Sequence, residues 1–106
     1  MRVSLLVFRL PPGTLNGEVG KFVKKLYGQA TSSWKGKYTY RRPGLLDGIP
    51  HRKLLRGVVI VRRRDQARVL AFLAEWKALV EVREVRPTAE DLRVLERNSS
   101  AHRAGQ

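Results

Sequence analysis

The residues best suited to chemistry lie in the middle of the chain, where cationic and aromatic side chains alternate. Between positions 34 and 56 the sequence places tryptophan and tyrosine among lysines, arginines and one histidine. Arginine and lysine neutralise phosphates, and aromatic rings stack on unpaired bases. Nearby cations extend this pattern on both sides and predict a nucleic-acid contact surface. Its predicted members are Lys21, Lys24, Lys25, Trp34, Lys35, Lys37, Tyr40, Arg41, Arg42, His51, Arg52, Lys53, Arg56, Arg62, Arg63 and Arg64.

A catalytic interpretation of the same segment rests on Asp47 and His51, which are four positions apart. With a neighbouring cation they could act as a metal-independent ribonuclease, in which histidine moves a proton and the cation stabilises the phosphorane. The spacing is unspecific, because Asp47-Gly48 is equally typical of a turn. We therefore predict that the protein is not an enzyme, and keep a small RNA-processing or toxin-like nuclease as an alternative.

Metal and cofactor chemistry has little support in the sequence. The chain contains no cysteine and two histidines, His51 and His102, and its carboxylates form no cluster that suggests a two-metal site. We predict neither a cofactor nor a metal. No stretch approaches the ~20 apolar residues of a membrane-spanning helix. We therefore predict no membrane association, and the lack of cysteine favours the cytoplasm.

The net charge of +13 at pH 7 is distributed unevenly along the chain. Residues 19–64 hold thirteen lysines and arginines against Asp47 alone, whereas residues 65–106 hold seven bases and seven acids. A localised positive field of this kind favours binding to a polyanion. A basic face kept only for solubility is the alternative reading.

Four segments are predicted as strands. The runs at 3–10 and 57–61 are almost continuously apolar, which is typical of strands in the middle of a sheet. The segments 34–42 and 79–85 carry charged residues and alternate in polarity, so we expect them at the two edges.

Helices are predicted between these strands and after the last one. Asn16 is expected to cap the first helix, Gly28 to end it, and Asp65 to cap the second. A short third helix is expected after Thr88, whose hydroxyl precedes two acids, and it would run to about Arg97.

The order β-α-β-β-α-β predicts an α+β fold, a ferredoxin-like sandwich in which two helices cover one face of an antiparallel sheet. Residues 1–97 would form this single domain with the short extra C-terminal helix, and residues 98–106 would form a polar tail.

The segment 42–56 is predicted as a long basic loop between the second and third strands. Connections of this length in compact domains tend to be functional. Its leucines and isoleucine can hold it to the body, and Pro43 and Pro50 reduce the entropy lost when it docks. We predict a semi-rigid finger whose basic residues face phosphates.

The predicted topology resembles that of the RNA recognition motif, which stacks bases on aromatic residues of its two central strands. The pair Arg56-Gly57 is similar to the start of that family's signature, whereas valine and isoleucine occupy positions 58–61. This departure shifts the predicted contact surface to segment 34–42, the loop and the first helix. In type the chain also resembles the small basic proteins of archaeal ribosomes, and its composition favours a thermophile.

The sequence thus predicts a non-catalytic protein that binds structured RNA. Within that class it favours a ribosomal or ribosome-associated protein, in contact with rRNA and neighbouring ribosomal proteins. A DNA-binding or chromatin protein is the second interpretation. A protein-interaction module that pairs through an edge strand also remains open.

Overall fold

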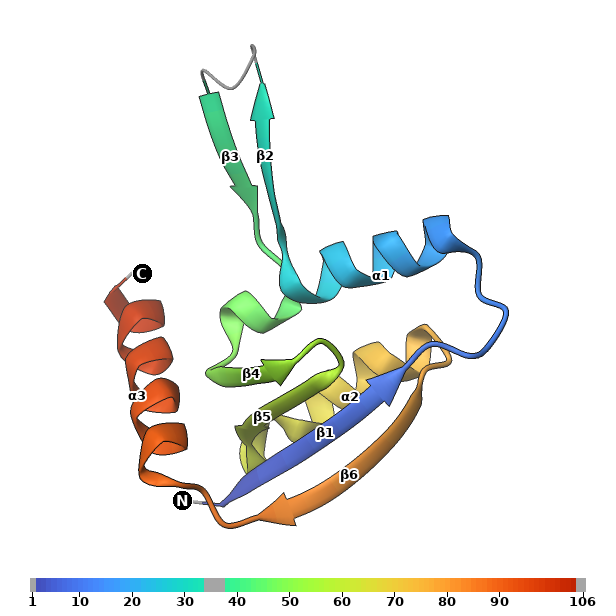
Figure 1. Cartoon of the computed structure of the whole chain (residues 1–106). Coiled ribbons are helices and arrows are strands. Elements are labelled where there is room, and N and C mark those ends of the chain that lie inside the picture. Colours follow the sequence, from blue (N-terminus) through green and yellow to red (C-terminus); the bar gives the residue numbers. More distant parts are fainter. Residues whose placement is uncertain (1, 34–37, 105–106) are drawn as a thin grey trace.

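The computed structural model describes residues 2–33 and 38–104, which form a mixed α+β structure (Figure 1). A four-stranded antiparallel sheet has the strand order β4-β5-β1-β6, and a second sheet contains β2 and β3. The predicted α+β class is confirmed. The elements are β1 (Val3–Arg9), α1 (Asn16–Tyr27), β2 (Gln29–Ser33), β3 (Tyr38–Arg42), the 3₁₀ helix η1 (Leu45–Gly48), β4 (His51–Leu55), β5 (Val58–Arg62), the 3₁₀ helix η2 (Arg63–Asp65), α2 (Gln66–Glu75), β6 (Leu79–Val85) and α3 (Ala89–Ala104).

The two continuous apolar runs form the centre of the large sheet, as predicted. β1 lies between β5 and β6, and both pairings are antiparallel, with Val3 opposite Arg62 on one side and opposite Val85 on the other. Both strands have neighbours on both edges, one face packs on α1 and α2, and the other face is covered by α3 at Val3 and Ile60 but is open at Val7, which is 40% exposed. Most side chains of these strands are therefore apolar, and such continuous apolar runs can be recognised from the sequence alone.

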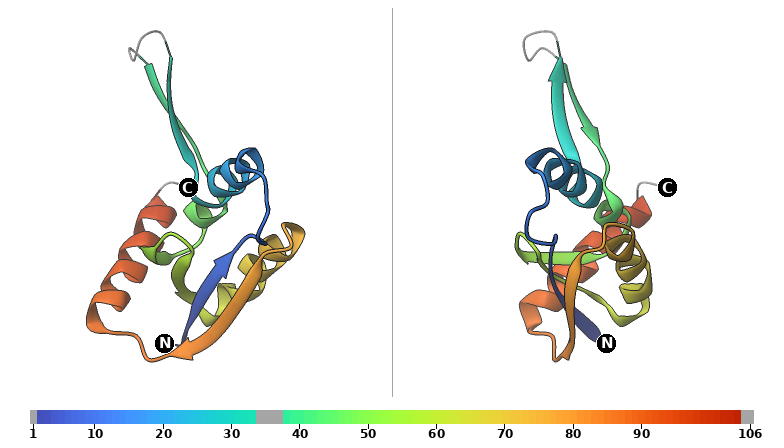
Figure 2. Two further views of the ribbon diagram at one scale, coloured as in Figure 1. Left: turned by 45° about the vertical axis from the view of Figure 1, so that its right-hand side comes forward. Right: turned by 90° about the vertical axis from the view of Figure 1, so that its right-hand side faces the viewer.

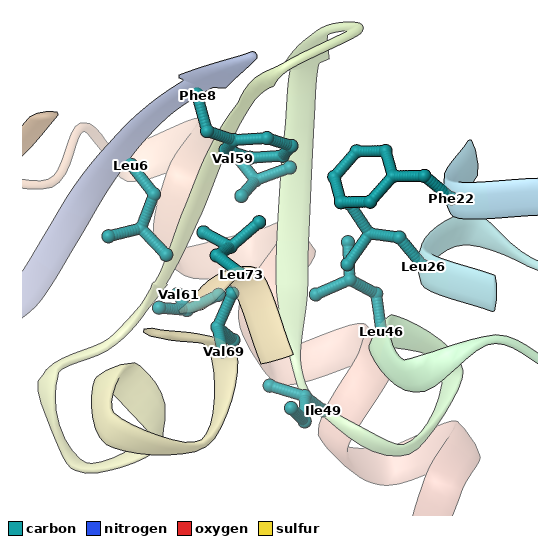
Figure 3. Packing of buried hydrophobic residues seen from close by; sticks show 10 residues of the cluster. All are labelled: Leu6, Phe8, Phe22, Leu26, Leu46, Ile49, Val59, Val61, Val69 and Leu73. Carbon is teal, nitrogen blue, oxygen red and sulfur yellow. The ribbon is translucent and has the colours of Figure 1, made fainter. Parts of the chain in front are cut away.

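The main core lies between the sheet and the helices α1 and α2 (Figure 3). Phe22 and Leu26 of α1 and Leu73 of α2 point into the same cluster, against side chains of one face of the sheet. Each fully buried side chain of this size contributes roughly 1.5–3 kcal/mol of transfer free energy. The cluster contains Leu6, Phe8, Phe22, Leu26, Leu46, Ile49, Val59, Val61, Val69 and Leu73.

Helix α3 packs against the sheet through a second, smaller cluster. Its Leu95 is buried against Val3 and Ile60. The predicted capping hydroxyl is confirmed: Asp91 N–H donates to Thr88 Oγ1 at 3.0 Å, and Thr88 N–H donates to the Asp91 carboxylate at 2.8 Å. This reciprocal pair satisfies two of the backbone donors that a helix start leaves free.

Helix α3 is longer than predicted. It continues to Ala104, so residues 98–104, which we predicted as part of a polar tail, are helical. Asn98, Ser99 and Ser100 are weak helix formers, but no glycine or proline follows Arg97 before Gly105, and two alanines and an arginine in this stretch favour the helix.

The prediction that segment 34–42 forms an edge strand of the main sheet is wrong. Its described part is β3, which pairs with β2 so that Gln29 lies opposite Arg42 and Ser33 opposite Tyr38. This β2–β3 hairpin projects from the body in every view (Figures 1 and 2). The alternating polarity of segment 34–42 indicated a strand but did not show which strand it pairs with. Its partner, QATSS, has too few apolar residues to be recognised as a strand from the sequence.

The prediction that residues 42–56 form a loop is also wrong. The segment contains η1 and then β4, the edge strand that pairs with β5. Leu46 and Ile49 are buried in the main core, which explains the apolar residues of this segment. The strand character of β4 was hidden because an edge strand buries little, and HRKLL looks like a cationic cluster.

The cap of α3 generates a testable prediction. The Asp91 carboxylate also accepts a hydrogen bond from Arg52 at 2.7 Å, and its side chain is 7% exposed. Replacing Asp91→Ala removes the cap and leaves Arg52 without its carboxylate, so we expect a loss of about 2 kcal/mol in the free energy of unfolding. Urea unfolding measures this, with Glu90→Ala, an exposed acid one position away, as the matched control.

The same residue gives the stability a pH dependence of known sign. The Thr88 N–H, and after it the Thr88 hydroxyl and Arg52, hold the pKa of Asp91 below its ordinary value despite burial. A lowered pKa means that the stabilisation is present above the ordinary carboxyl pKa and is lost as the pH falls through the lowered value. Stability should therefore fall less steeply below about pH 4 in Asp91→Ala than in the wild type. Equal slopes would contradict this assignment.

Candidate nucleic-acid interface

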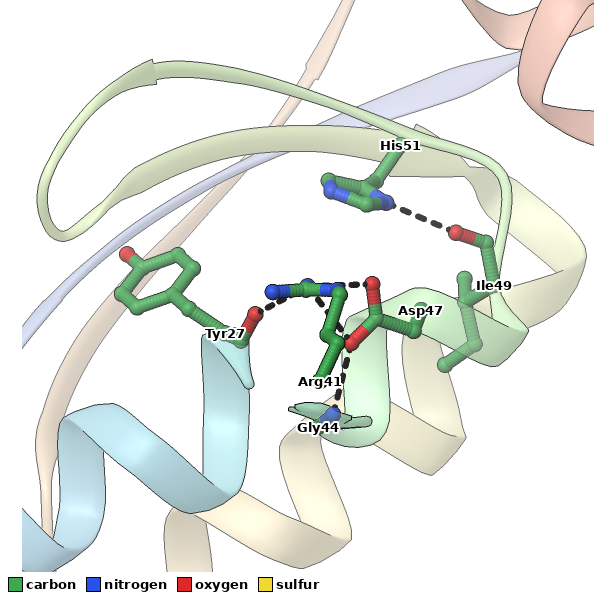
Figure 4. Close-up of polar contacts among 6 residues, drawn as sticks. All are labelled: Tyr27, Arg41, Gly44, Asp47, Ile49 and His51. Atoms are coloured by element: carbon green, nitrogen blue, oxygen red, sulfur yellow. Dashed lines mark hydrogen bonds and ion pairs between the residues drawn. The ribbon is translucent and has the colours of Figure 1, made fainter. Parts of the chain in front are cut away.

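The base of the hairpin is held to helix α1 by the side chain of Arg41 (Figure 4). Its guanidinium donates to the Tyr27 carbonyl at 3.0 Å and to both oxygens of Asp47, at 2.7 and 2.9 Å. Tyr27 is the last residue of α1, whose final carbonyls have no partner inside the helix and carry the negative end of its dipole. Arg41 therefore caps α1 and joins it to β3 and η1.

The same junction requires two glycines. Gly28 ends α1 with a φ of +88°, as predicted, and a Cβ there would lie 2.7 Å from the Asp47 carboxylate. Gly44 donates its N–H to Asp47 at 2.6 Å, and a Cβ on Gly44 would lie 2.6 Å from the Leu26 carbonyl oxygen. The chain leaving β3 therefore passes directly against the end of α1, and there is no room for a side chain.

A cation-lined hollow lies beside this junction. It has a volume of about 260 Å³ and is completed by Gln29 and Pro43. All four of its cationic residues are exposed. We call them the hairpin-base cluster: Lys21, Lys24, Lys25 and Arg42.

Little of the charge in this cluster is neutralised by the protein. Lys21 lies 3.6 Å from Glu18 in an exposed pair, which screening makes weak. Lys25 lies over the ring of Trp76, 5.9 Å from its centroid. Within the described residues, Lys24 and Arg42 form no ion pair with an acid. The hollow is therefore a region of positive potential that is open to water.

Three arginines predicted to contact nucleic acid are paired with acids of the protein. Arg41 binds Asp47, Arg52 binds Asp91, and Arg62 binds Asp65 at 2.7 Å. Asp65 was predicted to cap α2 and makes no side-chain capping bond: its backbone is helical, as the last residue of η2, and its carboxylate binds Arg62. These arginines position elements of the fold, and their charges are largely compensated.

Two further predicted residues lie around the Tyr27 side chain. Lys53 Nζ lies 4.1 Å from the centroid of the Tyr27 ring, a cation–π contact, and Arg56 is exposed in the turn between β4 and β5. The Tyr27 hydroxyl accepts a hydrogen bond from Gly57 N–H at 2.8 Å. Burial raises the pKa of Tyr27, against the opposing effects of the Gly57 N–H and Arg56. The phenol therefore keeps its proton at neutral pH.

A second group of cations lies at the opposite end of the sheet. Arg62, Arg63 and Arg64 line a hollow of about 470 Å³ together with Arg2, which the sequence did not single out. Arg2 lies 3.7 Å from Glu84, and Arg63 and Arg64 form no ion pair within the described residues. We call these four residues the arginine cluster. It shares no residue with the hairpin-base cluster, so the predicted cations line two separate hollows.

The residues of the catalytic interpretation each have their own partner. The Asp47 carboxylate binds Arg41 and the Gly44 N–H, and His51 Nδ1–H donates to the Ile49 carbonyl at 2.8 Å (Figure 4). In the part of the chain that the structure describes, no group of three or more histidine, aspartate or glutamate side chains could hold a metal ion. No helix among the described residues is both long and apolar enough to cross a membrane.

Some predicted contact residues cannot be placed. Trp34, Lys35 and Lys37 lie outside the described residues, and Tyr40 lies in β3 opposite Thr31.

The sequence analysis did not predict the contacts of Tyr27 with Arg41, Lys53 and Gly57. The signal that could have found Tyr27 is its position in the last turn of a helix that ends at a glycine, where hydrophobic contacts with the following segment are frequent.

Comparison of the chain with protein-family models, with curated proteins and with solved structures gives no match. The function must therefore be inferred from the site itself.

The close passage of Gly44 against α1 makes a sharp prediction. A Gly44→Ala substitution forces the backbone of η1 away from Leu26 and weakens the bond to Asp47, so we expect a loss of about 2 kcal/mol in the free energy of unfolding. Gly48→Ala is the matched control, because a Cβ at Gly48 meets nothing within 4 Å. Urea unfolding of both variants checks this, and equal stabilities would contradict the described junction.

Proposed function

We propose that the protein is a non-catalytic RNA-binding protein whose hairpin-base cluster lies against the sugar-phosphate backbone of a structured RNA. The supporting observation is the cation-lined hollow of about 260 Å³, in which Lys24 and Arg42 have no acidic partner within the described residues. A phosphate chain in this hollow lies within reach of several cations at once. Release of condensed counterions from the RNA then favours binding.

The β2–β3 hairpin supports a polymeric partner over a small anion. It rises from the body next to the cluster, so the surface extends well beyond the hollow (Figures 1 and 2). In the sequence, β3 and the residues before it alternate aromatic and cationic side chains, which suit stacking on unpaired bases and neutralisation of phosphates. We therefore assign to the hairpin the phosphate-facing role that was predicted for the segment 42–56.

We also propose that the body is a ferredoxin-like sandwich carrying the β2–β3 hairpin as an insertion. Without residues 29–42, the order of strands and α-helices up to β6 is β-α-β-β-α-β. In the large sheet β1 and β5 lie in the centre, β4 and β6 lie at the edges, and all neighbours are antiparallel. This arrangement supports the assignment. Under this proposal the hairpin is the functional addition to a common scaffold.

A DNA-binding protein is the second candidate, and the hairpin itself favours it. A two-stranded antiparallel ribbon can enter the major groove of B-form DNA, whereas the major groove of A-form RNA is too deep and narrow. Competition between a duplex DNA and a stem-loop RNA of equal length separates the two. We expect the protein to bind the stem-loop RNA with the higher affinity, because its unpaired loop offers bases as well as phosphates.

The hairpin-base cluster generates the main binding prediction. In the triple variant Lys21→Gln, Lys24→Gln, Arg42→Gln, the affinity for a stem-loop RNA should fall by at least about tenfold near 0.1 M salt. The slope of log K against log salt should become shallower by about 2 to 3, because three phosphate contacts are lost. Fluorescence anisotropy over a salt series measures both quantities.

The matched control removes the same charge elsewhere. Arg68, Arg86 and Arg97 are exposed and lie outside both clusters, so changing all three to glutamine tests net charge alone. Equal losses in the two triple variants would show a diffuse field and contradict the assigned surface. An effect confined to Arg63→Gln, Arg64→Gln would move the site to the arginine cluster. Cleavage of the RNA that is abolished by His51→Ala would support the nuclease alternative instead.

Within the RNA-binding class, we propose a ribosomal or ribosome-associated protein of the cytoplasm, in contact with rRNA and neighbouring ribosomal proteins. A projecting basic hairpin on a small body is suited to entering a folded RNA. In a sucrose gradient of cell lysate the protein should co-sediment with a ribosomal subunit, and be released by high salt because its contacts are mainly to phosphates. A position at the top of the gradient in low salt would contradict this.

A further inference from the structure

An apolar pocket lies on the sheet-facing side of α1. It has a volume of about 340 Å³, within the range of sites that take small organic groups. Phe8 of β1 and Phe22 of α1 lie in its wall with their ring centroids 6.1 Å apart at an angle of 75°. Its wall also includes Leu10, Pro11, Gly13, Thr14, Val19 and Val23.

Polar groups border this pocket at one end. Arg9 and Arg56 line it from the end of β1 and from the turn between β4 and β5, and neither forms an ion pair within the described residues. Tyr27 also lines it, and the Tyr27 hydroxyl is bonded to Gly57, another residue of the lining. Because that hydroxyl accepts the Gly57 N–H and keeps its own proton, it can donate one hydrogen bond to a ligand.

The combination is specific in its chemistry. An apolar and aromatic wall is suited to a planar ring system, and the Tyr27 hydroxyl can donate to a ring nitrogen or a carbonyl oxygen. Two uncompensated arginines at the same pocket suit a phosphate bonded to that ring through a sugar. A purely hydrocarbon ligand would not interact favourably with the arginines. An inorganic anion would not interact favourably with the apolar wall.

We propose that this pocket binds an unpaired nucleobase, with Arg9 and Arg56 on the adjoining phosphate. The inference rests on the proposed function, since it takes the base from an unpaired region of the bound RNA. On the helix, Val23 and Tyr27 lie on one row, and Gly20 and Lys24 lie on the next row around the axis. A single strand can therefore run from the hairpin-base cluster across the exposed side of α1 and place one base in the pocket.

The geometry also explains Gly57. Its φ is +86°, and a Cβ there would lie 2.7 Å from the Phe8 carbonyl oxygen. The turn between β4 and β5 can therefore pass close to the end of β1, which brings Arg56 and Arg9 to the same pocket. Phe8 N–H donates to the Gly57 carbonyl at 2.9 Å and holds the two segments together.

The first test uses mononucleotides followed by amide NMR signals. Adenosine monophosphate should shift the signals of Gly13, Thr14 and Gly57, whereas ribose 5-phosphate, which has no base, should not. Val19→Trp fills the pocket and should weaken the nucleotide effect at least tenfold. Leu15→Trp is the control, because Leu15 is 74% exposed and does not line the pocket. Equal shifts from both compounds, or an undiminished effect in folded Val19→Trp, would overturn the inference.

The second test uses the stem-loop RNA and separates the two proposals. Single bases are removed from the loop one at a time, and at one position the removal should lower the affinity of the wild type about tenfold. The Val19→Trp variant should bind the intact RNA with the same lowered affinity that the wild type has for that abasic RNA. The double variant Arg9→Gln, Arg56→Gln, which leaves the wall intact, should also lose affinity. If no abasic position matters while the hairpin-base cluster does, the pocket inference fails and the proposed function stands. If adenosine monophosphate binds but RNA does not, the proposed function fails and the pocket is a site for a free nucleotide.

Discussion

The bond network around Arg41 is the constraint on which the arrangement of this molecule depends. One guanidinium caps the end of α1 and binds Asp47, and Asp47 in turn binds the backbone of Gly44. Removal of this network would take these partners from the Tyr27 carbonyl and from the Gly44 N–H. Because η1 contributes Leu46 to the main core, the junction ties the projecting hairpin to that core. The basic surface beside it therefore has a fixed geometry.

The cations of the middle segment divide into two kinds. Arg41, Arg52 and Arg62 bind acids of the protein and hold elements together. The cations of the hairpin-base cluster lie on exposed surface, and within the described residues Lys24 and Arg42 have no acidic partner. Net charge alone does not distinguish these kinds, since a paired arginine and an unpaired one count equally in a sequence. The number and position of acids in the fold decide which is which.

The parts of the fold that could be predicted are those whose signal is local. Continuous apolar runs identified β1 and β5, and Gly28 marked the end of α1. Segment 79–85 was recovered with its bounds because its polarity pattern matches an edge strand. The capping pair Thr88 and Asp91 was readable because its spacing is a property of one helix turn.

The parts that could not be predicted depend on contacts between distant residues. Whether β3 joins the main sheet or pairs with β2 is decided by which strand occupies the edge beside β5, and that strand, β4, has a weak apolar signal. The same limitation applies to the site. Lys24 and Arg42 were both singled out, but their meeting in one hollow follows from the passage of Gly44 against α1. The pocket between Phe8 and Phe22 likewise forms from segments that are remote in the sequence.

Hydrogen–deuterium exchange with and without the stem-loop RNA tests the central claim most directly, because it locates the contact surface without any substitution. The account predicts slower exchange in the C-terminal half of α1, in the β2–β3 hairpin and in the turn between β4 and β5. Exchange in β6 and α3 should be unchanged. Slower exchange confined to α3 or to the arginine cluster, with no change around the hairpin base, would contradict it.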